Sequence, residues 1–133
     1  MKWIGIVLRT LVGAMFVMAG VMVLFNLVDQ GPEMEKMPED VQQYMRLMGG
    51  NGYLKVVKVL EIVGGLMLVS GFFVGLGITI LTPISVNILL YEVCIAKQPG
   101  IGIVMTVLCF VLVGLYWKHF RAAFSMKPLP CCG

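Results

Sequence analysis

One carboxylate, Glu61, lies inside a stretch that is otherwise apolar and rich in glycine, residues 60–65. An ionisable side chain at such a position in a membrane is costly, and it usually marks a proton path or a ligand contact. The alternative is a buried hydrogen-bonding residue that fixes how neighbouring helices pack. The sequence leaves both interpretations open.

Three further polar residues could share a site with Glu61, namely Arg9, Asn87 and Tyr91. A rise of about 1.5 Å per helical residue puts Glu61 about 12 Å from one membrane boundary and Asn87 at a similar depth. Because side chains lean toward the N-terminus of their own helix, we expect Glu61, Asn87 and Tyr91 to form one cluster. The same leaning directs Arg9 away from Glu61. Lys58, one helical turn earlier, is a second partner that the spacing allows.

The charge on Glu61 has two solutions in such a setting. A carboxylate at the centre of a spanning helix costs about 2.5–3.5 kcal/mol on insertion scales. Burial favours the protonated form, whereas a nearby cation or a water-filled cavity would allow the ionised form. The sequence does not choose between them.

Other chemistries lack the residues that they need. His119 is the only histidine and follows the last apolar segment, so neither a Ser-His-Asp set nor a zinc site is expected. No Cys-x-x-Cys motif occurs, and the adjacent Cys131 and Cys132 are either unmodified or lipidated. The Lys and Arg residues are scattered, which argues against nucleic-acid binding.

The composition predicts the elements that must position these residues. The chain is 59% hydrophobic and 13% charged, whereas a soluble domain averages about a quarter charged. We therefore predict an all-α membrane protein, a four-transmembrane-helix bundle in a single membrane domain (1–133). The expected spans cover about residues 3–27, 53–73, 77–96 and 101–117.

The ends of these spans follow from turn-forming and polar residues. Asn26, Asp29, Gly31 and Pro32 are expected to end the first span, and the glycine-containing stretch 73–77 is the best turn between the second and third. Pro83 is expected to kink the third span. Gly13, Phe16 and Gly20 share a helical face with Arg9, and Gly64 and Gly65 share one with Glu61, so both faces should point into the bundle.

The polar loop 28–52 and the basic tail 118–133 complete the predicted layout. Pro38, Glu39 and Asp40 resemble the first turn of a helix, and apolar residues recur at helical spacing from Val41 to Met48. We expect a short interfacial helix between spans 1 and 2. A lid over a site below it is the alternative. Positive charges divide evenly between the two sides, and the clustered basic tail favours cytoplasmic termini.

Several motifs together resemble the bacterial DoxX family (DoxX/DoxD-like) of membrane proteins. They are Leu8-Arg9 with Gly13 and Phe16, Met37-Pro38, residues 48–53, residues 60–66, Gly71-Phe72-Phe73 and, most closely, residues 81–90. This chain has Tyr91-Glu92 where relatives often carry Phe-His, so a role that needs that histidine does not transfer. The resemblance implies a four-span bundle in the bacterial inner membrane.

The resemblance also implies an association with quinone-linked or redox systems, without an assigned activity for most members. The first hypothesis is therefore a non-catalytic membrane component that binds a quinone-like or other lipophilic molecule, or a redox partner, around Glu61, Asn87 and Tyr91. An enzyme subunit in which Glu61 moves protons is the second hypothesis. A scaffold or assembly protein with structural polar residues is the third, and a homo-oligomer is compatible with each.

Overall fold

The computed structural model describes residues 2–25, 27, 35–98 and 100–121, with only the backbone at Lys2. All regular structure in these residues is helical, which confirms the all-α class. The elements are α1 (Lys2–Leu24), α3 (Glu39–Gly50), α4 (Tyr53–Ser70), α5 (Val74–Leu90), the π-helix η1 (Tyr91–Ile95), α6 (Ile101–Leu115) and α7 (Trp117–Phe120).

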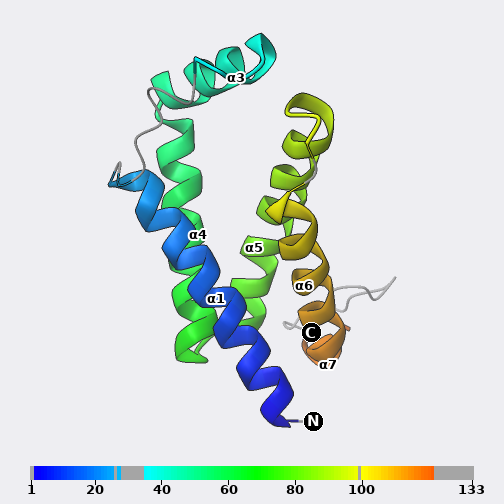
Figure 1. The fold of residues 1–133 in the computed structure, drawn as a ribbon. Coiled ribbons are helices and arrows are strands. Elements are labelled where there is room, and N and C mark those ends of the chain that lie inside the picture. Colours follow the sequence, from blue (N-terminus) through cyan, green and yellow to red (C-terminus); the bar gives the residue numbers. More distant parts are fainter. Residues whose placement is uncertain (1, 26, 28–34, 99, 122–133) are drawn as a thin grey trace, which may run out of the picture.

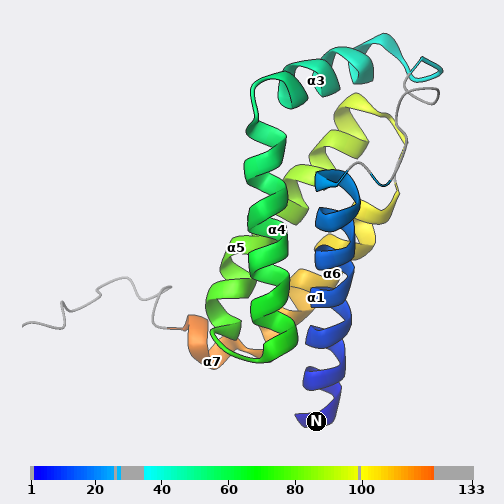
Figure 2. The ribbon, with the colours of Figure 1, turned by 90° about the vertical axis from the view of Figure 1, so that its left-hand side faces the viewer.

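The long helices run alternately up and down, so that α1 pairs with α4 and α5 pairs with α6 (Figure 1). The start of α1 and the short α7 lie at one end of the bundle, and α3 lies across the other end (Figure 2). We call these the terminal end and the α3 end. The two helix pairs are close together at the terminal end and diverge toward the α3 end (Figure 1).

The turn between α4 and α5 lies earlier than the sequence predicted. It consists of residues 71–73, where Gly71 has φ +81° and Phe73 has φ +53°. Gly71 ends α4 in the left-handed conformation that glycine adopts most easily. The predicted turn at 73–77 is therefore wrong. Gly77 lies inside α5, where a Cβ atom would be 3.0 Å from the carbonyl oxygen of Gly64. Gly77 therefore allows α5 to pack closely on α4 and does not form part of the turn.

Glycines allow α1 and α4 to touch through their backbones. A Cβ atom added to Gly13 would lie 2.7 Å from the carbonyl oxygen of Gly65, and one added to Gly65 would lie 2.7 Å from that of Gly13. At Gly20 a Cβ atom would meet the Ile62 side chain at 2.6 Å. Small residues drive this kind of close packing in membranes. The predicted small-residue faces of α1 and α4 are confirmed.

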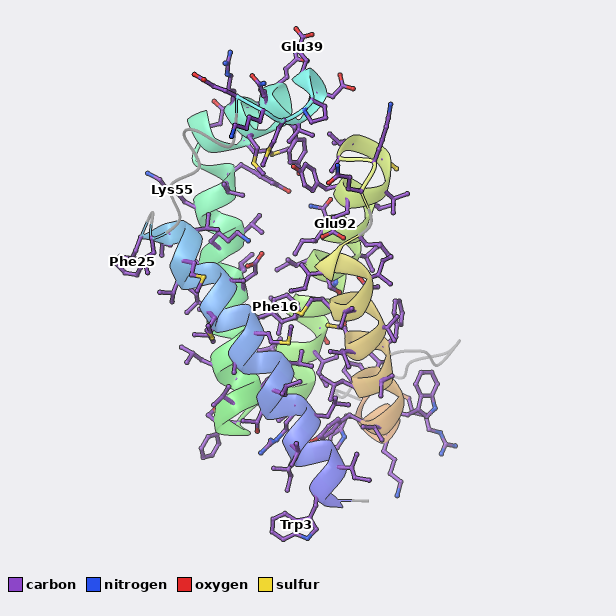
Figure 3. The ribbon with its side chains drawn as sticks, in the orientation of Figure 1. Trp3, Phe16, Phe25, Glu39, Lys55 and Glu92 are labelled. Carbon is purple, nitrogen blue, oxygen red and sulfur yellow. The ribbon has the colours of Figure 1, made fainter. Side chains whose placement is uncertain are left out.

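The packed core fills the part of the bundle toward the terminal end. Its buried side chains are Val12, Phe16, Leu68, Ile78, Leu81, Met105, Cys109 and Leu112. Between α5 and α6, the Thr106 hydroxyl donates a hydrogen bond of 2.9 Å to the Ser85 carbonyl oxygen. Phe16 projects from α1 toward the centre of the molecule (Figure 3).

The outer faces of the bundle are strongly apolar. Exposed large hydrophobic side chains occur along α1, α4, α5 and α6, and Trp3, at the terminal end, is 78% exposed (Figure 3). Two segments are long and apolar enough to cross a membrane, Trp3–Leu24 and Val74–Ile95. Helix α6 is equally apolar but shorter, and α4 carries three charges. An apolar surface of this extent supports the predicted membrane character.

The remaining boundaries agree with the predicted layout to within a few residues. The helix expected within the polar loop exists as α3. Helix α1 ends at Leu24, and Pro83 lies inside α5. The residues expected to end the first span (Asn26, Asp29, Gly31 and Pro32) lie outside the described residues, as do Cys131 and Cys132.

Candidate functional site

A cleft of about 470 Å³ opens where the two helix pairs diverge, below α3. Residues from α1, α3, α4, α5, η1 and α6 line it, and Phe16 joins it to the packed core. Its walls are mostly apolar. The polar side chains in the lining are Tyr44, Tyr53, Lys58, Glu61, Asn87 and Tyr91.

Glu61 is almost completely buried in the wall of the cleft and forms an ion pair with Lys58. The Lys58 Nζ lies 2.9 Å from both carboxylate oxygens, and the exposed fractions of the two side chains are 14% and 1%. A bidentate contact of this kind offsets the cost of burying the carboxylate. The sequence allowed two sets of partners for Glu61: Lys58 on the same helix, or Asn87 and Tyr91 across the bundle. Lys58 provides the direct hydrogen bonds.

Asn87 and Tyr91 line the same cleft as Glu61, on the opposite helix pair. The predicted proximity of Glu61 and Asn87 therefore takes the form of a shared cleft. No hydrogen bond joins either residue to Glu61 among the described contacts. Tyr91 instead packs against Tyr44 of α3, with ring centroids 4.8 Å apart and planes tilted by 32°.

Helix α3 lies across the end of the bundle at which the two helix pairs diverge (Figure 1). Tyr44, Met45 and Met48 from α3 contribute to its lining, while Val41 is buried. These are the residues whose helical spacing predicted an amphipathic helix. The side of α3 that the pattern marked as apolar therefore faces the cleft, an arrangement that favours the lid interpretation.

Methionine is the commonest residue in the walls of the cleft. The cleft methionines are Met15, Met18, Met22, Met45, Met48 and Met105. Methionine side chains are flexible and polarizable, so they adapt to apolar molecules of irregular shape. Their grouping could not be seen from spacing alone, because they come from three helices.

Arg9 is the one predicted site residue that lies away from the cleft. Its guanidinium packs on Gly71 at the terminal end, where a Cβ atom added to Gly71 would lie 2.6 Å from both Nη atoms. This location agrees with the predicted leaning of Arg9 away from Glu61. Arg9 therefore does not belong to the Glu61 site.

Glu92 has a structural role that the sequence analysis did not identify. Its carboxylate accepts hydrogen bonds from the backbone N–H groups of Gly100 (3.0 Å) and Gly102 (2.9 and 3.0 Å) at the start of α6. These N–H groups have no partner inside the helix, and the helix dipole favours a negative charge there. The Glu92 side chain extends from η1 toward α6, and its hydrogen bonds connect the two helices (Figure 3).

We expect Glu92→Ala to destabilise the protein by about 1–2 kcal/mol, since the N-terminal N–H groups of α6 lose their acceptor. Thermal unfolding of the purified variant in detergent measures the loss. The exposed Glu39 on α3, which makes none of these contacts, gives a control in Glu39→Ala. Equal stability of Glu92→Ala and wild type would show that the cap contributes nothing.

The other reactive side chains are dispersed. Cys94 is exposed and Cys109 is buried in the core, and both are free thiols. His119 is exposed on α7, with its ring centroid 6.0 Å from that of Tyr116. Within the described residues, no three His, Cys, Asp or Glu side chains are grouped so as to hold a metal ion.

The fold and the site together define a class: an all-helical membrane-type bundle with a buried ion pair in the wall of an apolar cleft. The family model described as DoxX matches residues 5–91, which include α1, α3, α4, α5 and the site residues Glu61, Asn87 and Tyr91. The chain belongs to the DoxX family. Comparisons with curated proteins and with solved structures gave no significant match.

Proposed function

We propose that this protein is a component or partner of a quinone-linked or other redox system in the membrane, and that it binds a quinone-like lipophilic molecule in the Glu61 cleft. The observation that carries the proposal is the cleft itself. Its volume of about 470 Å³ falls in the range of small-molecule sites, roughly 300–1,000 Å³, which are also mainly apolar with a few polar groups.

The polar groups of the cleft suit a molecule with uncharged hydrogen-bond acceptors. Lys58 and Glu61 neutralise each other, so the pair presents no net charge to a ligand. An ammonium group has three N–H donors, and after pairing with Glu61 at least one remains for a ligand carbonyl. Asn87 and Tyr91 offer further donors on the facing wall. The methionine walls would accommodate an attached hydrocarbon chain.

A scaffold or assembly protein is the second candidate, and the ion pair favours it. Glu61 has both oxygens hydrogen-bonded within its own helix, as a structural polar residue would. A scaffold, however, has no need of an open cleft beside that pair. The cleft is therefore the feature that favours ligand binding over a purely structural role.

The proposed setting is the bacterial inner membrane, with α1, α4, α5 with η1, and α6 as four spans and α3 at the membrane surface. An even number of spans brings the first and last helix ends to the same side of a membrane. The start of α1 and the short α7 do lie at one end of the bundle (Figure 2). We place that end in the cytoplasm, because Lys118 and Arg121 follow the last span. A redox protein of the membrane or a second copy of the chain are the proposed partners.

Filling the cleft tests the proposal. Ala19 lines the cleft and Ala14, on the same helix, is exposed outside it. We expect full-length protein purified from its membrane to carry a prenylated quinone, detected by lipid extraction and mass spectrometry. Ala19→Phe should reduce the amount of quinone bound per protein molecule roughly tenfold. A tenfold reduction corresponds to a loss of about 1.4 kcal/mol in binding free energy. Ala14→Phe should leave it unchanged.

Glu61→Gln tests the contribution of the Lys58–Glu61 pair to quinone binding without changing the volume of the cleft. Glutamine keeps the shape and can still accept a hydrogen bond from Lys58, so the fold should survive while quinone binding falls. If wild type carries no quinone, and added quinone does not bind it more tightly than Ala19→Phe, the binding proposal is wrong and the scaffold function stands.

A further inference from the structure

Arg9 lies in an apolar part of the bundle, and no described residue forms a salt bridge with it. Its Nε atom is buried, and none of the described residues accepts a hydrogen bond from it. The only salt bridge among the described residues joins Lys58 to Glu61. An arginine inside a membrane protein normally pairs with an acceptor or reaches the interface.

None of the acidic side chains that the structure describes could serve Arg9. All seven Asp and Glu residues fall between positions 29 and 92. The five described ones are Glu35, Glu39, Asp40, Glu61 and Glu92, which lie at or before α3, in the cleft, or at the start of η1. Glu61, ten residues before Gly71, is about 15 Å away from it along α4.

The terminal end of the bundle is correspondingly positive. Lys118 and Arg121 are exposed there, together with His119, whose Cβ lies 4.0 Å from the position of a Cβ on Gly75. Trp3 and Trp117 are exposed at the same end, as aromatic residues are at the headgroup level of membranes. Cationic and aromatic residues thus surround the end of the molecule toward which Arg9 leans.

The Arg9 guanidinium lies against the α4–α5 turn. A Cβ atom added to Gly71 would lie 2.6 Å from both Nη atoms, so glycine leaves room for the guanidinium there. A guanidinium carries a planar fork of N–H donors, which matches the oxygens of a phosphate group.

We infer that Arg9 binds the phosphodiester of an anionic phospholipid at the terminal end, at a site separate from the Glu61 cleft. The phosphate supplies the negative charge that the described residues lack at this end. Lys118 and Arg121 add a general attraction for an anionic headgroup. The site thereby anchors the α4–α5 turn to one leaflet.

Lipid retention tests the inference. Full-length protein is reconstituted in bilayers of equal phosphatidylglycerol and phosphatidylcholine, and the lipids that stay bound are measured by native mass spectrometry. Wild type should retain phosphatidylglycerol in preference. Arg9→Met should lower that retention roughly tenfold, as expected for a lost charge-assisted hydrogen bond. Arg46→Met, an exposed arginine on α3, is the matched control and should behave as wild type.

The controls separate the remaining outcomes. Arg9→Lys keeps the positive charge but lacks the planar fork of donors, so it should show an intermediate loss of phosphatidylglycerol retention. This variant also keeps the inference testable if Arg9→Met does not fold. Wild type that retains the two lipids in the proportion of the bilayer overturns the inference, as does an equal loss in Arg46→Met. Inorganic phosphate is also added as a competitor. If millimolar phosphate displaces phosphatidylglycerol, the site binds free phosphate and the lipid assignment is wrong.

Discussion

Lys58→Met is expected to lower the free energy of unfolding by about 3–5 kcal/mol, because it leaves the buried Glu61 carboxylate without its cation. Glu61 is 1% exposed, and within the described residues its only hydrogen bonds come from Lys58. Equilibrium unfolding of the purified protein in mixed micelles measures the change. The effect should be among the largest available from a single side chain.

Two further variants show whether the loss comes from the unpaired charge. Lys55→Met removes an exposed lysine one turn earlier on α4, which points away from the cleft, and should change stability by less than about 0.5 kcal/mol (Figure 3). Lys58→Met combined with Glu61→Gln should recover most of the loss, because no charge remains buried. A double variant as unstable as Lys58→Met alone would contradict this account.

Gly65→Ala is the second substitution for which we expect a large effect. The new methyl carbon would lie 2.7 Å from the Gly13 carbonyl oxygen and 2.8 Å from a Val17 methyl group. The Gly13 backbone cannot move aside without separating α1 from α4. Overpacking of this kind typically costs about 1–3 kcal/mol, and a contact with backbone belongs at the upper end of that range.

Gly49→Ala provides the matched control in α3. Nothing lies within 4 Å of a Cβ atom at Gly49. Alanine should therefore be neutral there, or stabilising by up to about 1 kcal/mol through its better helix propensity. Thermal unfolding midpoints of both variants check the prediction. Equal midpoints for Gly65→Ala and Gly49→Ala would show that the α1–α4 contact tolerates a methyl group.

The sequence predicted the helices well because their ends carry strong local signals. The 1.5 Å helical rise placed Glu61 and Asn87 at similar depths, and both residues line one cleft. The turn was misplaced because residues 71–77 contain three glycines, and Phe73 adopts a positive φ that is uncommon for a residue with a side chain.

Contacts between distant segments were harder to predict. Glu92 caps α6 because the chain folds back through residues 96–100, and nothing in the local pattern shows which N–H groups a carboxylate will meet. For Glu61, both a partner on its own helix and partners across the bundle satisfied the spacing. Only the side-chain geometry shows that Lys58 provides the hydrogen bonds and that Asn87 and Tyr91 face it across open space.

The reciprocal Gly13–Gly65 contact makes α1 and α4 a stiff unit, and the Thr106–Ser85 hydrogen bond joins α6 to α5. The two units are linked covalently at residues 71–73 and also pack together through the core at that narrow end, so a relative rotation would pivot near that turn. Helix α5 is about 25 Å long. A rotation of only 5° about the turn would therefore move the far tips apart by roughly 2 Å. Such a rotation would separate Tyr44 from Tyr91, and it would also disturb the close packing of Gly77 on Gly64 between α4 and α5, so this packing limits how far the mouth of the cleft widens.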